Sequence, residues 1–179
     1  DSRPYHFGTY PLETLPRDDS IVAQEAGRAP SPPLGPQASP EGPLGRAARD
    51  YRELFAGQCA GEVAPKKAPV PDDLERRAVD LKGYAYFMNA SQVGICRVPS
   101  SAWLAGAEAL NHEFAVVILI EHERVPEVGN RARDGVAPAV TEVADMRAAE
   151  IAVCVARHVR SMGFAAHAHI AGHAGLDAQ

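Results

Sequence analysis

The spacing of apolar residues changes near residue 72, and from there the chain predicts regular secondary structure. Apolar side chains recur every three or four positions, which is the spacing of one face of an amphipathic helix. They are Leu74, Ala78, Leu81, Ala85 and Met88. Asp72 and Asp73 precede this face and suit the positive end of a helix dipole, so they predict where the helix starts. A short strand is predicted next, at 93–96.

Two further strands and a second helix are predicted downstream. Residues 114–120 are apolar without alternation, which is typical of a strand buried on both faces. Residues 121–140 are polar and predict a long loop. A helix is expected from about 141 to 162, with Gly163 just beyond its end. Apolar and polar side chains alternate over 164–170, which predicts a third strand.

The first 71 residues follow a different pattern, because proline dominates them. Twelve of the 15 prolines fall at or before Pro71. Such a segment buries too little apolar surface to fold alone, so we expect 1–71 to be extended, with one short helix at 47–56. Residues 72–179 then form an α+β domain with a three-stranded sheet. We expect this domain to be incomplete at its C-terminal end, because a buried strand needs neighbours on its edges.

Composition excludes several classes of partner. The net charge is −5 with both signs mixed, so neither a nucleic acid nor an anionic membrane is expected. No apolar run approaches the roughly 18 residues of a membrane span, and no signal peptide is visible, although the chain begins with Asp1. Cys59, Cys96 and Cys154 are widely spaced, which indicates small buried thiols in a reducing, cytoplasmic compartment. Three cysteines are also too few for an iron–sulfur cluster, which takes about four thiolates.

The most distinctive local feature is the run His167-x-His169-x-x-x-His173. Two histidines at i and i+2 share one face of a strand, and the third could fold back toward them. With Asp177 they resemble a transition-metal ligand set, but solvent-facing or hydrogen-bonded histidines fit the same pattern. We expect no resident metal, and we take His169 and His167 as the candidate cofactor-binding residues.

Two weaker candidates have structural alternatives. Glu121-His122-Glu123 follows the apolar strand and could serve acid–base chemistry, or could mark the point where the strand reaches water. His158 lies between Arg157 and Arg160 in a cationic last turn that suits the negative end of a helix dipole.

Aromatic side chains and missing motifs complete the inventory. Tyr84, Tyr86 and Phe87 could line a flat ligand or belong to the core. The sequence contains no P-loop, dinucleotide-binding, nucleophile-elbow or C-x-x-C motif. No complete catalytic constellation is therefore visible, and the catalytic residues stay unknown.

Four stretches nevertheless resemble the cobalamin-dependent reductive dehalogenases, and more distantly epoxyqueuosine reductase. Residues 84–103 (YAYFMNASQVGICRVPSSAW) resemble the family's helix, short strand and post-proline aromatic. Residues 112–120 (HEFAVVILI) resemble its central strand, and 149–166 its helix ending in a Gly-aromatic pair. The opening residues 8–18 (GTYPLETLPRD) are similar to the soluble, catabolic branch.

The resemblance implies a partial nitroreductase-like three-layer domain from the N-terminal part of such an enzyme. It implies cobalamin and two [4Fe–4S] clusters, bound mainly outside this chain, and reductive removal of halogen from organohalides, aromatic ones above all. The implied partners are the remainder of the enzyme, the organohalide and an electron donor protein or reductase. Whether the chain is itself an enzyme stays open, because the family's catalytic and cluster-binding segments match no position here.

Three other hypotheses remain open at this stage. One is a non-catalytic accessory domain that packs on a catalytic corrinoid partner. A second is a related corrinoid enzyme that cleaves an ether or an epoxide. The third is a separate metal protein built on His167, His169 and His173.

Overall fold

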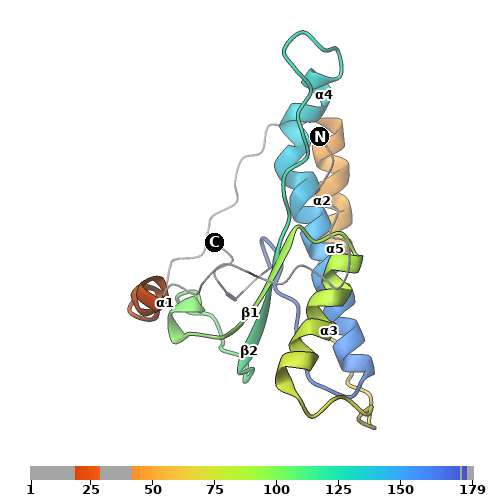
Figure 1. Ribbon diagram of the computed structural model, residues 1–179. Coiled ribbons are helices and arrows are strands. Elements are labelled where there is room, and N and C mark those ends of the chain that lie inside the picture. The colour runs from red at the N-terminus through yellow and green to blue at the C-terminus, as the bar shows by residue number, and fades with distance from the viewer. Residues whose placement is uncertain (1–18, 29–41, 174, 177–179) are drawn as a thin grey trace.

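The computed structural model describes residues 19–28, 42–173, 175 and 176 (Figure 1). In chain order its elements are α1 (Asp19–Ala26), α2 (Pro43–Ala56), α3 (Leu74–Phe87), β1 (Gln92–Arg97), the 3-10 turn η1 (Ser100–Ala102), β2 (Phe114–Leu119), α4 (Arg133–Val136), the 3-10 turn η2 (Ala137–Ala139) and α5 (Val140–Ser161). Helices around a small sheet confirm the α+β class. No helix among the described residues is long and apolar enough to cross a membrane.

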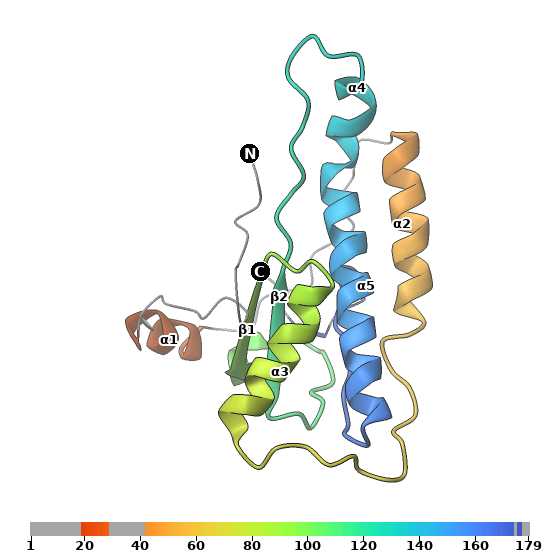
Figure 2. The ribbon, with the colours of Figure 1, turned by 45° about the vertical axis from the view of Figure 1, so that its right-hand side comes forward.

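The long helix α5 organises the molecule, and α2 runs beside it (Figures 1 and 2). Small residues on α2 permit the close approach, since Gly45 and Ala48 are buried in the contact. Glu142 of α5 is also buried there, and its carboxylate pairs with Arg49 at 3.3 Å and Arg52 at 3.2 Å. Burial raises the pKa of the neighbouring Asp145, although Arg52 opposes that rise. The two helices are thus joined by small-residue packing and by a half-buried ion network.

Helix α3 and the two-stranded sheet pack on another side of α5 (Figure 2). Asp73 caps α3 as expected, because its carboxylate accepts the backbone N–H groups of Glu75 and Arg76. Strand β1 pairs antiparallel with β2, with Val93 opposite Ile118. The buried cluster between these elements consists of Ala85, Ala90, Val93, Ile151 and Val155.

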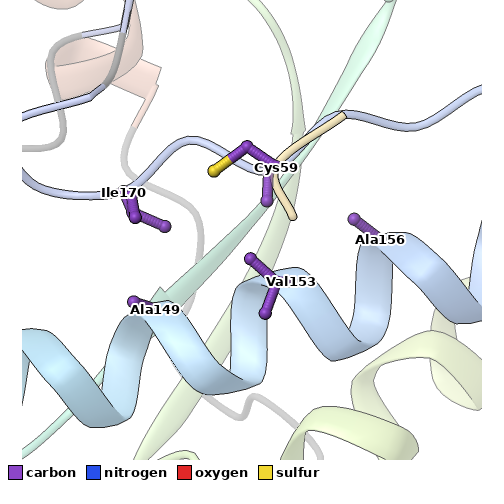
Figure 3. Close-up of a cluster of buried hydrophobic side chains, with 6 residues drawn as sticks. Cys59, Ala149, Val153, Ala156 and Ile170 are labelled. Carbon is purple, nitrogen blue, oxygen red and sulfur yellow. The ribbon is translucent and has the colours of Figure 1, made fainter. Parts of the chain in front are cut away.

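A second buried cluster lies where two irregular segments, the connector 57–73 between α2 and α3 and the segment 164–170, cross α5 (Figure 3). Its residues are Cys59, Ala149, Val153, Ala156, Ala168 and Ile170. The Arg160 guanidinium holds both segments, since it donates to the carbonyl oxygens of Gln58, Cys59 and Ala166 at 3.0–3.2 Å. The predicted helix end at Gly163 is confirmed by its φ of 84°. The connector and the last described segment are therefore fixed to the end of one helix.

The predicted third strand at 164–170 is wrong, and the sheet has two strands in the described part of the chain. The segment alternates as predicted, but its backbone does not join a ladder. The N–H of Ala168 donates to the carbonyl of Cys59, and the carbonyl of Ala166 accepts from Arg160. The backbone groups of this segment thus bond to a connector and a side chain rather than to a neighbouring strand.

The expectation that β2 is buried on both faces is also wrong for this chain. Val117 is 45% exposed and Leu119 is 53% exposed, both on the face opposite the helices. The prediction of buried thiols holds for Cys59 and fails for Cys96 and Cys154, which are exposed. Apolar residues therefore remain uncovered where the sequence predicted interior.

The first 71 residues contain more helix than the proline content predicted. α1 was not expected, and α2 begins four residues earlier than the predicted 47–56, with Pro43 in its first turn. Proline is tolerated in the first turn because the N–H groups there have no partner within the helix. Residues 1–18 and 29–41, which belong to the predicted extended segment, lie outside the described residues.

Candidate functional site

An open cleft of about 270 Å³ lies between β2, α5 and the segment 165–169. Its walls are mostly aliphatic. They include Phe114, Val116 and Ile118 of β2, Ala152, Val155, Ala156 and Val159 of α5, and Leu81 of α3. An apolar cleft with a few polar groups is the usual form of a small-molecule site, and this volume lies just below the roughly 300–1,000 Å³ typical of such sites.

The polar lining of the cleft consists of three histidines and a tryptophan. His167 and His169 come from one extended segment, whose Ala168 and Ile170 are buried in the cluster over α5. Alternation along the segment therefore presents both imidazoles to the cleft, with their ring centroids 4.9 Å apart. Trp103 meets the His169 ring edge-on at 5.9 Å. His112, just before β2, completes the lining.

Burial keeps the imidazoles of His167 and His169 uncharged at neutral pH. Burial and the neighbouring His167 and His112 lower the pKa of His169 to about 4. Burial, His112 and Arg160 likewise lower the pKa of His167. Nδ1 of His169 is buried without a hydrogen-bond partner. The cleft thus holds neutral imidazoles, one of which has an unsatisfied ring nitrogen.

The third histidine of the sequence motif does not join this group. His173 is exposed, and its Nε2 lies 2.6 Å from the carboxylate of Glu53 on α2. The described residues contain no group of three or more His, Cys, Asp or Glu placed to hold a metal ion. Asp177, the fourth ligand considered, lies outside the described residues. The arrangement therefore gives no support to a metal site built on the three histidines of the motif.

The acidic candidate Glu121-His122-Glu123 is exposed and lies outside the cleft lining. The N–H of Glu121 donates to the Ser91 hydroxyl, and Glu123 pairs with Arg147 of α5. These contacts favour the structural alternative, in which charged residues mark the end of a strand.

The remaining candidates have structural contacts. His158 packs edge-on against Tyr84 at 4.3 Å between ring centroids. The Tyr86 hydroxyl accepts a hydrogen bond from the N–H of Val93, whereas Phe87 is 82% exposed. The prediction that these aromatics form core holds only for the partly buried Tyr86.

Sequence reasoning missed two members of the site, Trp103 and His112. Each is a single residue in an irregular segment, more than 50 positions before His167, and no spacing connects them. Only the fold brings them to the cleft. There, Trp103 forms an isolated antiparallel β-bridge with Leu176.

Solved structures of reductive dehalogenases are similar to this chain. One, whose structure suggests a mechanism for B12-dependent dehalogenation, is 36% identical with a TM-score of 0.70 over 84% of this chain. The chain belongs to the cobalamin-dependent reductive dehalogenase family. The catabolic reductive dehalogenase NpRdhA matches at 34% identity with the same TM-score and coverage. NpRdhA in complex with 3-bromo-4-hydroxybenzoic acid matches at 36% identity.

This reductive dehalogenase chain spans only 21–23% of the length of those solved structures. No protein-family model and no curated protein matches its sequence.

The described residues do not form a complete site for a corrinoid or for a [4Fe–4S] cluster. A cleft of about 270 Å³ suits a single substituted ring, and a corrin macrocycle is much larger than that. The imidazoles of His167 and His169 could therefore meet only one edge of a corrinoid. The three free cysteines are one fewer than the four thiolates that a [4Fe–4S] cluster takes.

Proposed function

We propose that this chain is the N-terminal part of a corrinoid- and iron–sulfur-dependent reductive dehalogenase that acts on aromatic organohalides. The observation that carries the proposal is 36% identity to a B12-dependent dehalogenase over 84% of the chain, with a TM-score of 0.70. The aromatic substrate is supported by the 3-bromo-4-hydroxybenzoic acid bound to NpRdhA. When bound, the corrinoid would supply the electrons that cleave the carbon–halogen bond.

Exposed apolar surface supports the proposal that further protein covers this chain. Phe87 of α3 and Val117 and Leu119 of β2 are each more than 40% exposed. An apolar strand with an open face is rarely left in water, because it invites pairing and aggregation. A nitroreductase-like layer from the remainder of the enzyme would cover β2 and complete the sheet.

Within the complete enzyme, we propose that His167 and His169 border the corrinoid and substrate pocket. This role is supported by the apolar cleft that the two residues line and by their neutral imidazoles. The cluster-binding cysteines and the proton donor would belong to the remainder of the enzyme. The same proposal includes a cytoplasmic location and an electron donor protein or reductase as partners.

The test of this function is halide release by the complete protein under anaerobic conditions. With a reduced viologen as electron donor, the enzyme loaded with cobalamin and iron should release bromide from 3-bromo-4-hydroxybenzoate. The protein without cobalamin is the control and should release none. A loaded enzyme that releases no bromide from this or other bromophenols would contradict the proposal. A structure with cobalamin in which residues 164–173 contact no cofactor atom would remove the role of His167 and His169.

A further inference from the structure

The cleft has an unusual selection of ionisable groups. Among the described residues, its ionisable lining residues are His112, His167 and His169, and no carboxylate, lysine or arginine lines it. Aliphatic side chains form the rest of the wall, apart from Phe114 and Trp103. A ligand in this cleft therefore meets apolar groups and imidazoles, and its polar contacts must be made to ring nitrogens.

A buried cation lies behind this lining. Arg160 is 5% exposed, and its guanidinium donates hydrogen bonds to three backbone carbonyl oxygens. No carboxylate among the described residues pairs with it. Its charge is close enough to contribute to the lowered pKa of His167. The ionisable groups at the cleft, among the described residues, are thus the imidazoles that line it and one buried guanidinium behind them, with no carboxylate, so the cleft favours a negative ligand over a metal cation.

The hydrogen-bonding state of His169 also selects a ligand. Its Nδ1 is buried without a partner, and an unpaired buried N–H costs more than an unpaired lone pair. The neutral ring should therefore carry its proton on Nε2, which leaves Nε2–H as the donor available to a ligand. With the His167 ring centroid 4.9 Å away, two donors can meet the two oxygens of one carboxylate.

We propose that this cleft binds a small aromatic carboxylate, with its ring against the aliphatic wall and Trp103 and its oxygens on the imidazoles of His167 and His169. The volume of about 270 Å³ suits one substituted ring. The proposal goes beyond the dehalogenase function and does not need the corrinoid. It assigns a ligand to residues of this chain alone.

Binding of the anion should be accompanied by uptake of a proton. A carboxylate beside His169 stabilises the imidazolium, so the pKa of about 4 in the free protein rises in the complex. Between the free and bound pKa values, the complex holds more protons than the free protein. The affinity must therefore increase as the pH falls.

The test is calorimetric titration of the purified 179-residue chain with benzoate at pH 6.0 and pH 8.0, where benzoate is ionised at both. We expect benzoate to bind about tenfold more tightly at pH 6.0, which corresponds to a rise in the pKa of His169 from about 4 in the free protein to about 7 in the complex. Benzamide, the neutral analogue of the same shape, should bind at least about tenfold more weakly than benzoate, and acetate should also bind weakly because it lacks the ring. Equal affinity for benzoate and benzamide, or no binding of benzoate, would overturn the proposal.

Matched variants locate the site. His169→Gln should lower benzoate affinity about tenfold and reduce its pH dependence, whereas the exposed His122→Gln should leave both unchanged. Wild-type affinity in His169→Gln would contradict the assignment. If that variant does not fold, His167→Gln and the proton uptake of the wild-type chain decide the question. Failure of benzoate binding leaves bromide release by the complete enzyme untouched, so the two proposals fail separately.

Discussion

The histidines of the cleft owe their properties to the residues on either side of them. Ala168 and Ile170 are buried over α5 and fix the extended segment, so the intervening imidazoles face the cleft. Apolar surroundings then disfavour the charged form, and each imidazole disfavours charge on the next. A sequence pattern that suggests metal ligands therefore produces neutral hydrogen-bonding groups in this fold.

The lowered pKa of His169 predicts a loss of stability in mild acid. His169 binds a proton near pH 6.5 in the unfolded chain and only near pH 4 in the folded chain. The stabilisation linked to this shift is therefore fully present above about pH 6.5 and is lost as the pH falls to about 4. Allowing for partial exposure, the loss should be about 1–3 kcal/mol. Urea unfolding at pH 7 and pH 4.5 measures it. His169→Phe should flatten the decline and His122→Phe should not; the same decline in both variants would exclude His169 as its source.

Arg160 should be the most sensitive charged residue at the end of α5. In Arg160→Met, the carbonyl oxygens that the guanidinium now binds lose their donor in a buried position. We expect a loss of about 2–4 kcal/mol in the free energy of unfolding. The exposed Arg157→Met on the same turn is the control and should change it by less than about 0.5 kcal/mol. Equal effects in urea unfolding would show that Arg160 does not hold the two segments.

At the scale of elements, the sequence predicted local structure well and pairing poorly. The 3.6-residue period and the Asp73 cap placed α3 within one residue of its observed end and start. The alternation at 164–170 is present in the structure. The backbone of this segment, however, hydrogen-bonds to the connector at Cys59, which no periodicity can reveal. The apolar run of β2 correctly predicted a strand and incorrectly predicted its burial in this chain, because burial depends on elements elsewhere.

The Gly163 turn that ends α5 tests how tightly the connector packs. Gly163 and Gly172 both have positive φ, but a Cβ on Gly163 would lie 2.7 Å from the Lys66 carbonyl oxygen, whereas one on Gly172 meets nothing within 4 Å. Gly172→Ala should therefore cost only the backbone strain, about 1–2 kcal/mol. Gly163→Ala adds a collision and should cost at least about 1 kcal/mol more. Thermal unfolding of both variants measures the difference, and equal losses would contradict the packing of 66–67 against this turn.

At the scale of the whole molecule, segments of this chain build the cleft, whereas the exposed apolar surface agrees with protein that lies outside this chain. Trp103 and His112 lie more than 50 positions before His167, so the sequence could supply His167 and His169 as site residues but not Trp103 and His112. The family resemblance in the sequence is confirmed by the solved structures, which match 84% of the chain. Exposed residues of α3 and β2 agree with a chain that covers about a fifth of those structures.

The central claim is that this chain works as one part of a corrinoid-dependent dehalogenase. Intact mass and visible absorption of the protein purified anaerobically from its own cells test this most directly. We predict a polypeptide much larger than 19.1 kDa, or a stable complex of that size, with corrinoid bands and a broad iron–sulfur shoulder. A folded, colourless species of 19.1 kDa with no larger partner would contradict the claim.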